Sequence, residues 1–114
     1  MSLATKDEVN GFLSHLKTIL SIGDLLFISR NVNTQTLVDL EIMPKQREEY
    51  LGKIVLEDYS EGPIENDQYG TEPMWVFGKI INAKEIYIKI TITELNVVCI
   101  SFHTSQYPMN YPFK

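Results

Sequence analysis

The chain has 114 residues, 44% of them hydrophobic and 22% charged, which is typical of one globular domain with its own apolar core. No apolar run approaches the roughly 20 residues of a membrane span, and Cys99, the only cysteine, allows neither an internal disulfide nor a Cys/His zinc cluster. The formal net charge of −5 argues against long-range attraction to nucleic acid, and we expect a cytoplasmic protein without a cofactor or a membrane partner.

The segment from Thr5 to Gly23 has the pattern of an amphipathic helix. The segment from Thr5 to Glu8 has the form of a capping box, in which a hydroxyl and a carboxylate satisfy free N–H groups at a helix start. Apolar residues then recur at three- and four-residue spacing up to Gly23, the predicted stop. They are Val9, Phe12, Leu13, Leu16, Ile19 and Leu20. His15 lies at the edge of this stripe, and we interpret it as a helix-surface residue rather than a catalytic one.

Shorter elements follow this helix. Residues 25–29 predict an edge or first strand, and Asn33-Thr34 offers a cap for a brief helix through Leu40. Pro44 suits the first position of a helix over residues 44–51, which Gly52 would end in the left-handed conformation. Residues 5–52 are therefore the expected helical part of a single domain spanning 1–114.

From Glu57 to Glu72 the chain carries six acidic residues and no basic one. The spacing of Glu65, Asp67 and Gly70 imitates the start of an EF-hand loop, but Val76 occupies the place of the bidentate carboxylate. We therefore expect a solvated acidic loop, able to bind a basic partner, and no metal site.

Three β-branched and aromatic segments, at residues 74–81, 85–93 and 97–103, predict an antiparallel meander. Helices followed by strands indicate an α+β fold, with the N-terminal helices packed on one face of a C-terminal antiparallel sheet. The middle segment alternates four isoleucines with polar residues, so one face of the sheet is apolar and the other polar.

Matching the apolar faces predicts the register of the last hairpin. A connection over residues 94–96 pairs Thr93 with Val97, Thr91 with Cys99, Lys89 with Ser101 and Tyr87 with His103. A connection over residues 82–84 would pair Lys79 with Tyr87 and turn Trp75 and Phe77 outward, whereas a two-residue turn would reverse this. The first alternative forms a row of Lys79, Tyr87 and His103, with Lys89 and Ser101 in the next row.

Such a row has the groups that metal-free RNA cleavage requires. A base takes the 2′-hydroxyl proton, a cation stabilises the phosphorane, and an acid protonates the leaving oxygen. Tyr87, His103, Lys89 and Lys79 are the candidate catalytic residues. The alternative is that these polar residues are only the solvated face of a half-exposed sheet.

The segment from Met74 to His103 resembles the C-terminal hairpin region of the motility and quorum-sensing regulator toxins (MqsR), members of the RelE-like superfamily. The resemblance is clearest at residues 86–89 and 100–102 and weaker at 55–62. It implies a compact ribonuclease toxin that cleaves messenger RNA without metal and is silenced by a cognate antitoxin.

The family's functional tyrosine falls on Tyr87 and its C-terminal lysine on His103. Its other lysine and its glutamine fall on Ser60 and Val76, which puts specificity and activity in question.

The tail, residues 104–114, contains aromatic residues and prolines. Tyr107 and Tyr111, with Trp75 and Ser101 on the sheet, are candidates for RNA binding by stacking or hydrogen bonding. The tail could instead fold back and block a sheet edge. The alternative is a non-enzymatic interaction or immunity-type domain of the same fold that binds a protein partner. The negative net charge and the absence of the two family residues favour this alternative.

Overall fold

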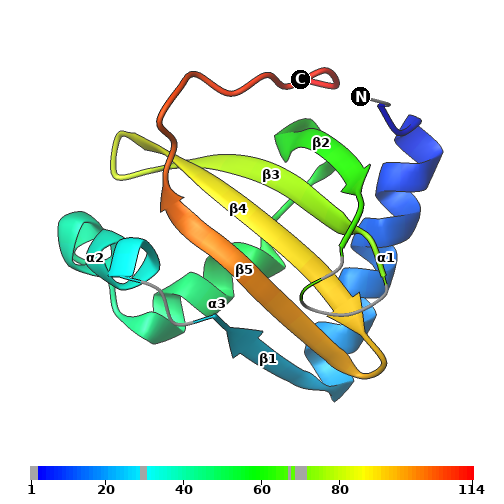
Figure 1. Cartoon of the computed structure of the whole chain (residues 1–114), viewed down its shortest axis with the longest axis horizontal. Coiled ribbons are helices and arrows are strands. Elements are labelled where there is room, and N and C mark those ends of the chain that lie inside the picture. Colours follow the sequence, from blue (N-terminus) through cyan, green and yellow to red (C-terminus); the bar gives the residue numbers. More distant parts are fainter. Residues whose placement is uncertain (1–2, 29–30, 67, 69–71) are drawn as a thin grey trace.

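The computed structural model describes residues 3–28, 31–66, 68 and 72–114. Within these segments the elements follow one another in the order α1 (Lys6–Ile22), β1 (Asp24–Phe27), α2 (Asn31–Leu40), α3 (Pro44–Gly52), a 3₁₀ turn η1 (Leu56–Asp58), β2 (Tyr59–Ile64), β3 (Met74–Ile81), β4 (Lys84–Thr93) and β5 (Asn96–Thr104). Helices therefore precede most of the strands, as the sequence predicts (Figure 1).

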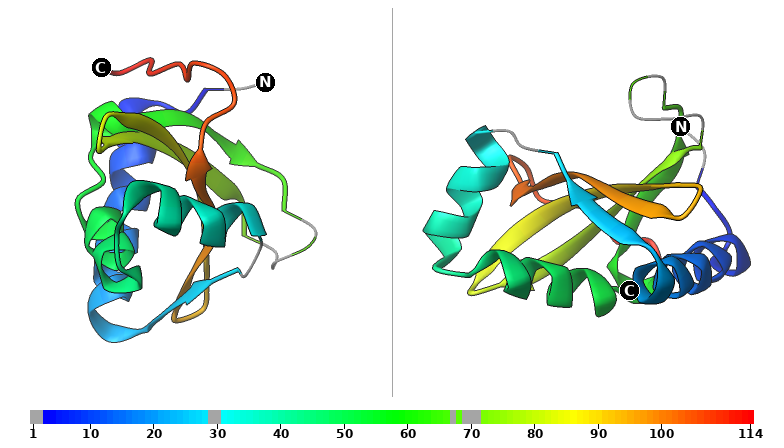
Figure 2. Two further views of the ribbon diagram at one scale, coloured as in Figure 1. Left: turned by 90° about the vertical axis from the view of Figure 1, so that its left-hand side faces the viewer. Right: turned by 90° about the horizontal axis from the view of Figure 1, so that it is seen from below.

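The strands form one sheet in the order β1-β5-β4-β3-β2. Neighbouring strands are antiparallel except β1, which runs parallel to β5, so the sheet is mixed rather than purely antiparallel. The helices α1 and α3 lie on the same face of the sheet (Figure 2). The predicted α+β class, with helices packed against the sheet, is confirmed, and the short strand predicted near residue 25 is the edge strand β1.

The capping box and the apolar stripe of α1 are both confirmed. The Glu8 amide donates to Thr5 Oγ1 at 3.2 Å, and the Thr5 amide donates to Glu8 Oε1 at 2.9 Å. The buried stripe joins the isoleucines of β4 in one apolar cluster. Its residues are Val9, Leu13, Leu16 and Ile19. Burial of this stripe, worth roughly 1.5–3 kcal/mol for each large side chain, holds α1 against the sheet.

Asn33 is not the cap predicted for the second helix, because α2 already begins at Asn31. The Asn33 side chain is buried and donates to the carbonyls of Ile28 and Ile100 at 3.0 and 3.1 Å, while its Oδ1 accepts from the Phe102 amide at 3.1 Å. The Asn33 side-chain amide therefore provides hydrogen-bond partners for backbone groups of β5 just beyond the point where its pairing with β1 ends.

The third helix begins at Pro44 as predicted, but the prediction for its end is wrong. Gly52 is the last helical residue rather than a left-handed cap, and Lys53 follows with φ −101°. The side chain of Arg47 lies over the Phe27 ring, 3.5 Å from its centroid, and so attaches α3 to β1.

The acidic stretch is only partly loop. Its first residues form η1 and β2, and Asp58 Oδ2 lies 3.0 Å from Lys79 Nζ. Asp67 and Gly70 of the EF-hand-like spacing lie outside the described residues. Where the structure describes the chain, no cluster of three or more His, Cys, Asp or Glu side chains could hold a metal ion. No helix in the same segments is long and apolar enough to cross a membrane.

The turn between β3 and β4 has two residues, Asn82 and Ala83, with φ 50° and 68°. Ile81 therefore pairs with Lys84, and Gly78 rather than Lys79 lies opposite Tyr87. Two-residue hairpins with both φ values positive match the natural twist of antiparallel strands. The predicted three-residue connection is wrong, and every side chain of β3 lies on the face opposite to the one expected.

The turn between β4 and β5 is also shorter than predicted. Glu94 and Leu95 form it, so Thr93 pairs with Asn96 and Thr91 with Val98, and the predicted pairs near the turn are wrong. The register shifts by one residue between Lys89 and Ile90, where Ile100 is the extra residue of β5. Beyond this bulge the predicted pairs of Lys89 with Ser101 and Tyr87 with His103 are both confirmed.

Candidate functional site

The sheet face turned away from α1 and α3, here called the outer face, carries Tyr87 and His103 side by side. Their rings stack with centroids 5.4 Å apart and planes at 17°. In the neighbouring row Lys89 places its Nζ 6.0 Å from the Tyr87 ring centroid. A phenol, an imidazole and an ammonium group therefore gather on one patch of the sheet.

Strand alternation explains this placement. Ile86, Ile88 and Ile90 are fully buried on the helix side, so the intervening Tyr87 and Lys89 must point the other way.

His103 Nδ1 lies 3.1 Å from the Thr104 carbonyl oxygen. A carbonyl oxygen only accepts, so this contact requires a hydrogen on Nδ1 and leaves Nε2 as the lone-pair nitrogen of the neutral ring.

A cleft of about 330 Å³ opens beside this pair. Tyr87 and His103 line it from the sheet, Ser60 and Glu61 line it from β2, and residues 105–109 of the tail form a further wall. Tyr107 in that wall is 77% exposed. The volume lies at the low end of ordinary ligand pockets, which suits one nucleotide-sized group rather than a large ligand.

Glu85 holds the tail over the outer face. Its backbone carbonyl accepts from the Ser105 amide at 2.9 Å, and its carboxylate accepts from the Met109 amide at 3.0 Å and from Tyr111 Oη at 2.7 Å. Burial and the Glu85 carboxylate both raise the pKa of Tyr111 above its usual range, so the phenol remains a donor. The contacts fix the wall of the cleft against β4.

Two further contacts complete the path of the tail. Met109 and Tyr111 pack on Gly78, where an added Cβ would lie 2.8 Å from Met109 Sδ. Phe113 then stacks on Tyr59 with centroids 5.4 Å apart and lies near the start of α1, where Lys6 Nζ is 6.0 Å from the centroid of the Phe113 ring. The tail is folded back, as one of the two sequence-based alternatives predicts: it crosses the outer face at Gly78 and ends on Tyr59, the first residue of the edge strand β2.

Two predicted site residues are elsewhere. Lys79 points to the helix side and pairs with Asp58, and Trp75 is buried in the core, where its ring stacks on Phe12 at 4.9 Å. The predicted placement of both side chains on the outer face is wrong, because the β3–β4 turn has two residues. Ser101 lies in the predicted row but is only 2% exposed.

Sequence reasoning missed Glu61 and Glu85. Glu61 reaches the cleft because β2 pairs with β3, a pairing for which the sequence offered no register. Glu85 was recognised only as the start of a strand, and its role depends on the path of the tail. Ser60, where the resemblance places a lost lysine, lines the cleft, whereas Val76 is fully buried.

Comparisons with known proteins give no match for this chain: no family model fits it, and neither curated proteins nor solved structures are significantly similar to it. The geometry of the outer face, together with the chemistry of its side chains, is therefore the basis for a function.

Proposed function

We propose that this protein is a metal-independent endoribonuclease of the RelE-like toxin type that cleaves messenger RNA and is controlled by a cognate antitoxin. One observation carries the proposal: Tyr87 and His103 stack on the outer face at 5.4 Å, with the Lys89 ammonium group beside them, at the edge of a cleft. The resemblance of this hairpin to the MqsR toxins supports the choice of RNA as substrate.

The reaction needs two proton transfers and one positive charge. A base removes the 2′-hydroxyl proton, the 2′-oxygen forms a bond to phosphorus, and the bond from phosphorus to the 5′-oxygen breaks as an acid protonates that oxygen. The products are a 2′,3′-cyclic phosphate and a 5′-hydroxyl. His103 and Glu61, which line the same cleft, are the proton-transfer groups, and Lys89 stabilises the phosphorane charge.

Binding depends on stacking more than on charge. The chain carries −5 overall, and Glu61 adds a negative charge at the cleft itself. With Lys89 as the cation of the patch, about one phosphate is neutralised, so the slope of log affinity against log salt should be roughly −0.7. The Tyr87–His103 stack and the exposed Tyr107 ring provide faces for unpaired bases.

The two missing family residues are compensated within this arrangement. Ser60 lines the cleft but lacks the charge of a lysine, and the buried Val76 cannot reach substrate. Lys89, which pairs with Val76 across β3 and β4, is a cation in the row next to Tyr87 and His103. Lys89 therefore takes the role of phosphate contact in this proposal.

The test uses the full chain on a single-stranded RNA and on DNA of the same sequence, in EDTA. RNA should be cut to fragments with cyclic phosphate ends, whereas DNA, which lacks the 2′-hydroxyl, should remain intact. His103→Ala and Lys89→Met should each lower the rate by about 10²-fold or more. Lys79→Met is the matched control, because that lysine lies on the other face, and its rate should be unchanged.

Expression in a bacterial host tests the same site on messenger RNAs that are being translated. Growth should stop with the wild-type chain and resume with His103→Ala or Lys89→Met. Equal growth arrest by all three would remove the active-site assignment. Intact RNA in both assays, with tight binding to a basic protein, would instead establish the interaction-domain alternative that the net charge favours.

A further inference from the structure

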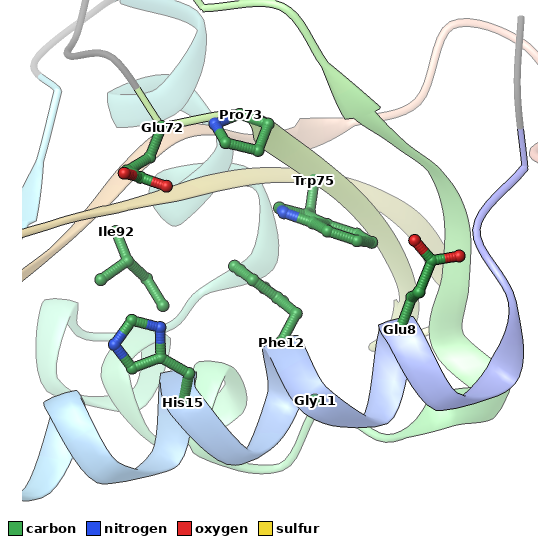
Figure 3. Close-up of a pocket in the computed structure, with 8 residues that line it drawn as sticks. All are labelled: Glu8, Gly11, Phe12, His15, Glu72, Pro73, Trp75 and Ile92. Carbon is green, nitrogen blue, oxygen red and sulfur yellow. The ribbon is translucent and has the colours of Figure 1, made fainter.

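A second hollow, here called the α1 groove, lies between α1 and the beginning of β3, on the helix side of the sheet. It encloses about 400 Å³ and has an apolar floor made by Phe12, Trp75 and Ile92 (Figure 3). Phe12 and Trp75 stack with ring centroids 4.9 Å apart, and Trp75 and Ile92 are 8% and 4% exposed. The floor is therefore a packed aromatic surface on regular secondary structure.

Gly11 lies inside α1 and faces this groove. Glycine is a poor residue for a helix interior, so its presence there needs a reason. Packing within the chain gives none, since a Cβ at residue 11 would have no atom within 4 Å. The missing side chain leaves the helix backbone open at the groove, which is what close approach of another chain requires.

Carboxylates stand at both ends of the aromatic floor. Figure 3 shows Glu8 beyond Trp75 at one end and Glu72 with His15 at the other. Glu8 is held in place because its Oε1 accepts from the Thr5 amide at 2.9 Å. No lysine or arginine is among the described residues lining the groove, so its rim is negative.

We propose that the α1 groove docks a segment of a protein partner in which an apolar side chain is flanked by lysine or arginine. The apolar side chain lies on the Phe12–Trp75 stack, the backbone passes over Gly11, and the cations meet Glu8 and Glu72. This partner site is independent of the proposed nuclease, because it lies on the opposite face of the sheet from Tyr87 and His103. The evidence for its occupant is the match between an apolar floor and a negative rim.

A random peptide library displayed on phage and selected on the full chain tests this inference. Selected sequences should share an apolar residue between basic ones. A synthetic peptide of that consensus should change the emission of Trp75, the only tryptophan, in a saturable and salt-sensitive way. Replacing its lysines and arginines by glutamates should abolish the change.

Gly11→Leu is the decisive variant. It fills the groove and supplies a better helix former, so the midpoint of thermal unfolding should stay the same or rise by roughly 3–6 °C while peptide affinity falls at least tenfold. Gly52→Leu is the matched control, since a Cβ there also meets nothing within 4 Å, and its affinity should be unchanged. Glu72→Gln should weaken binding severalfold.

Three results would overturn the inference. The selected peptides could show no basic and apolar consensus, they could bind Gly11→Leu as tightly as the wild type, or the Trp75 signal could arise only from self-association seen by sedimentation. None of these results bears on RNA cleavage by the outer face, so the two proposals fail separately.

Discussion

Gly78→Ala tests how the tail is held over the outer face. Gly78 lies opposite Tyr87 in the β3–β4 ladder, and the tail residues Met109 and Tyr111 cover it. A methyl group at residue 78 would lie 2.8 Å from Met109 Sδ and 2.8 Å from Tyr111 Cε1, and closer still to Tyr111 Oη. The flexible thioether can move aside, but the phenol is fixed by its 2.7 Å bond to Glu85 and must break that bond to make room.

The size of the effect follows from that bond. A hydrogen bond to a charged group contributes about 1.5–3 kcal/mol. The docked tail also has the stack of Phe113 on Tyr59, worth about 0.5–1.5 kcal/mol. Ordering its residues costs about 1 kcal/mol or more each, so the net free energy of docking is small. Loss of the Tyr111–Glu85 bond should therefore release the tail in most molecules.

Carboxypeptidase digestion of the full chain measures this release. We expect residues 105–114 to be removed at least tenfold faster from Gly78→Ala than from the wild type, with global stability lower by about 1–2 kcal/mol in denaturant unfolding. Gly52→Ala, where the methyl meets nothing within 4 Å, is the control and should leave the tail protected.

A second background shows whether the methyl acts through Tyr111. In Tyr111→Ala the ring is absent, so adding Gly78→Ala should have little further effect on digestion or stability. The reasoning is refuted if the tail of Gly78→Ala remains as resistant as the wild type, or if the full penalty persists without the Tyr111 ring.

Further predictions concern the core and the tail. Lys79→Met should cost about 1–2 kcal/mol in denaturant unfolding, because it leaves Asp58, 19% exposed, without its partner at 3.0 Å. Asn33→Ala should cost about 2–4 kcal/mol by the same measurement, since three hydrogen bonds to the backbone around β5 are lost, whereas Asn10→Ala on the exposed side of α1 should change stability by less than about 0.5 kcal/mol. Burial raises the pKa of Cys99 to about 12, so alkylation at pH 8 should be at least roughly a thousandfold slower in the folded chain than in the unfolded one. The pKa of Tyr111 is raised in the folded state, so its contribution to tail docking is complete below about pH 10 and is lost as the pH rises further, which carboxypeptidase digestion at increasing pH should detect.

Local rules were sufficient for much of the fold. The capping box places the start of α1, and the apolar stripe identifies the face that packs on the sheet. Strand positions and the α+β class follow equally from periodicity and from the order of helices and strands. The parallel pairing of β1 with β5 could not be obtained in this way, because it depends on the path of the chain through α1 rather than on any residue of β1.

The candidate site shows where hydrophobic matching reaches its limit. In β3 the apolar residues occupy both phases, so a three-residue connection and a two-residue turn bury comparable surface. The positive φ values of Asn82 and Ala83 decide between them. The consequence is that Lys79 and Trp75 were assigned to the wrong face, whereas Lys89, in the unambiguous β4, was placed correctly.

The pair of Tyr87 and His103 owes its placement to the bulge at Ile100. With the two-residue turn and no bulge, Tyr87 would lie opposite Phe102, and His103 would turn toward the core. Residues 97–100 are all apolar, so either set of alternating side chains in this part of β5 could face the core. Beyond the bulge Phe102 is buried in the core, and its burial determines which side chains of β5 face outward. The predicted connection was one residue too long and the bulge adds one residue, so the two errors cancel at the site. The position of His103 is therefore fixed by burial of Phe102, and not by the turn from which the register was first derived.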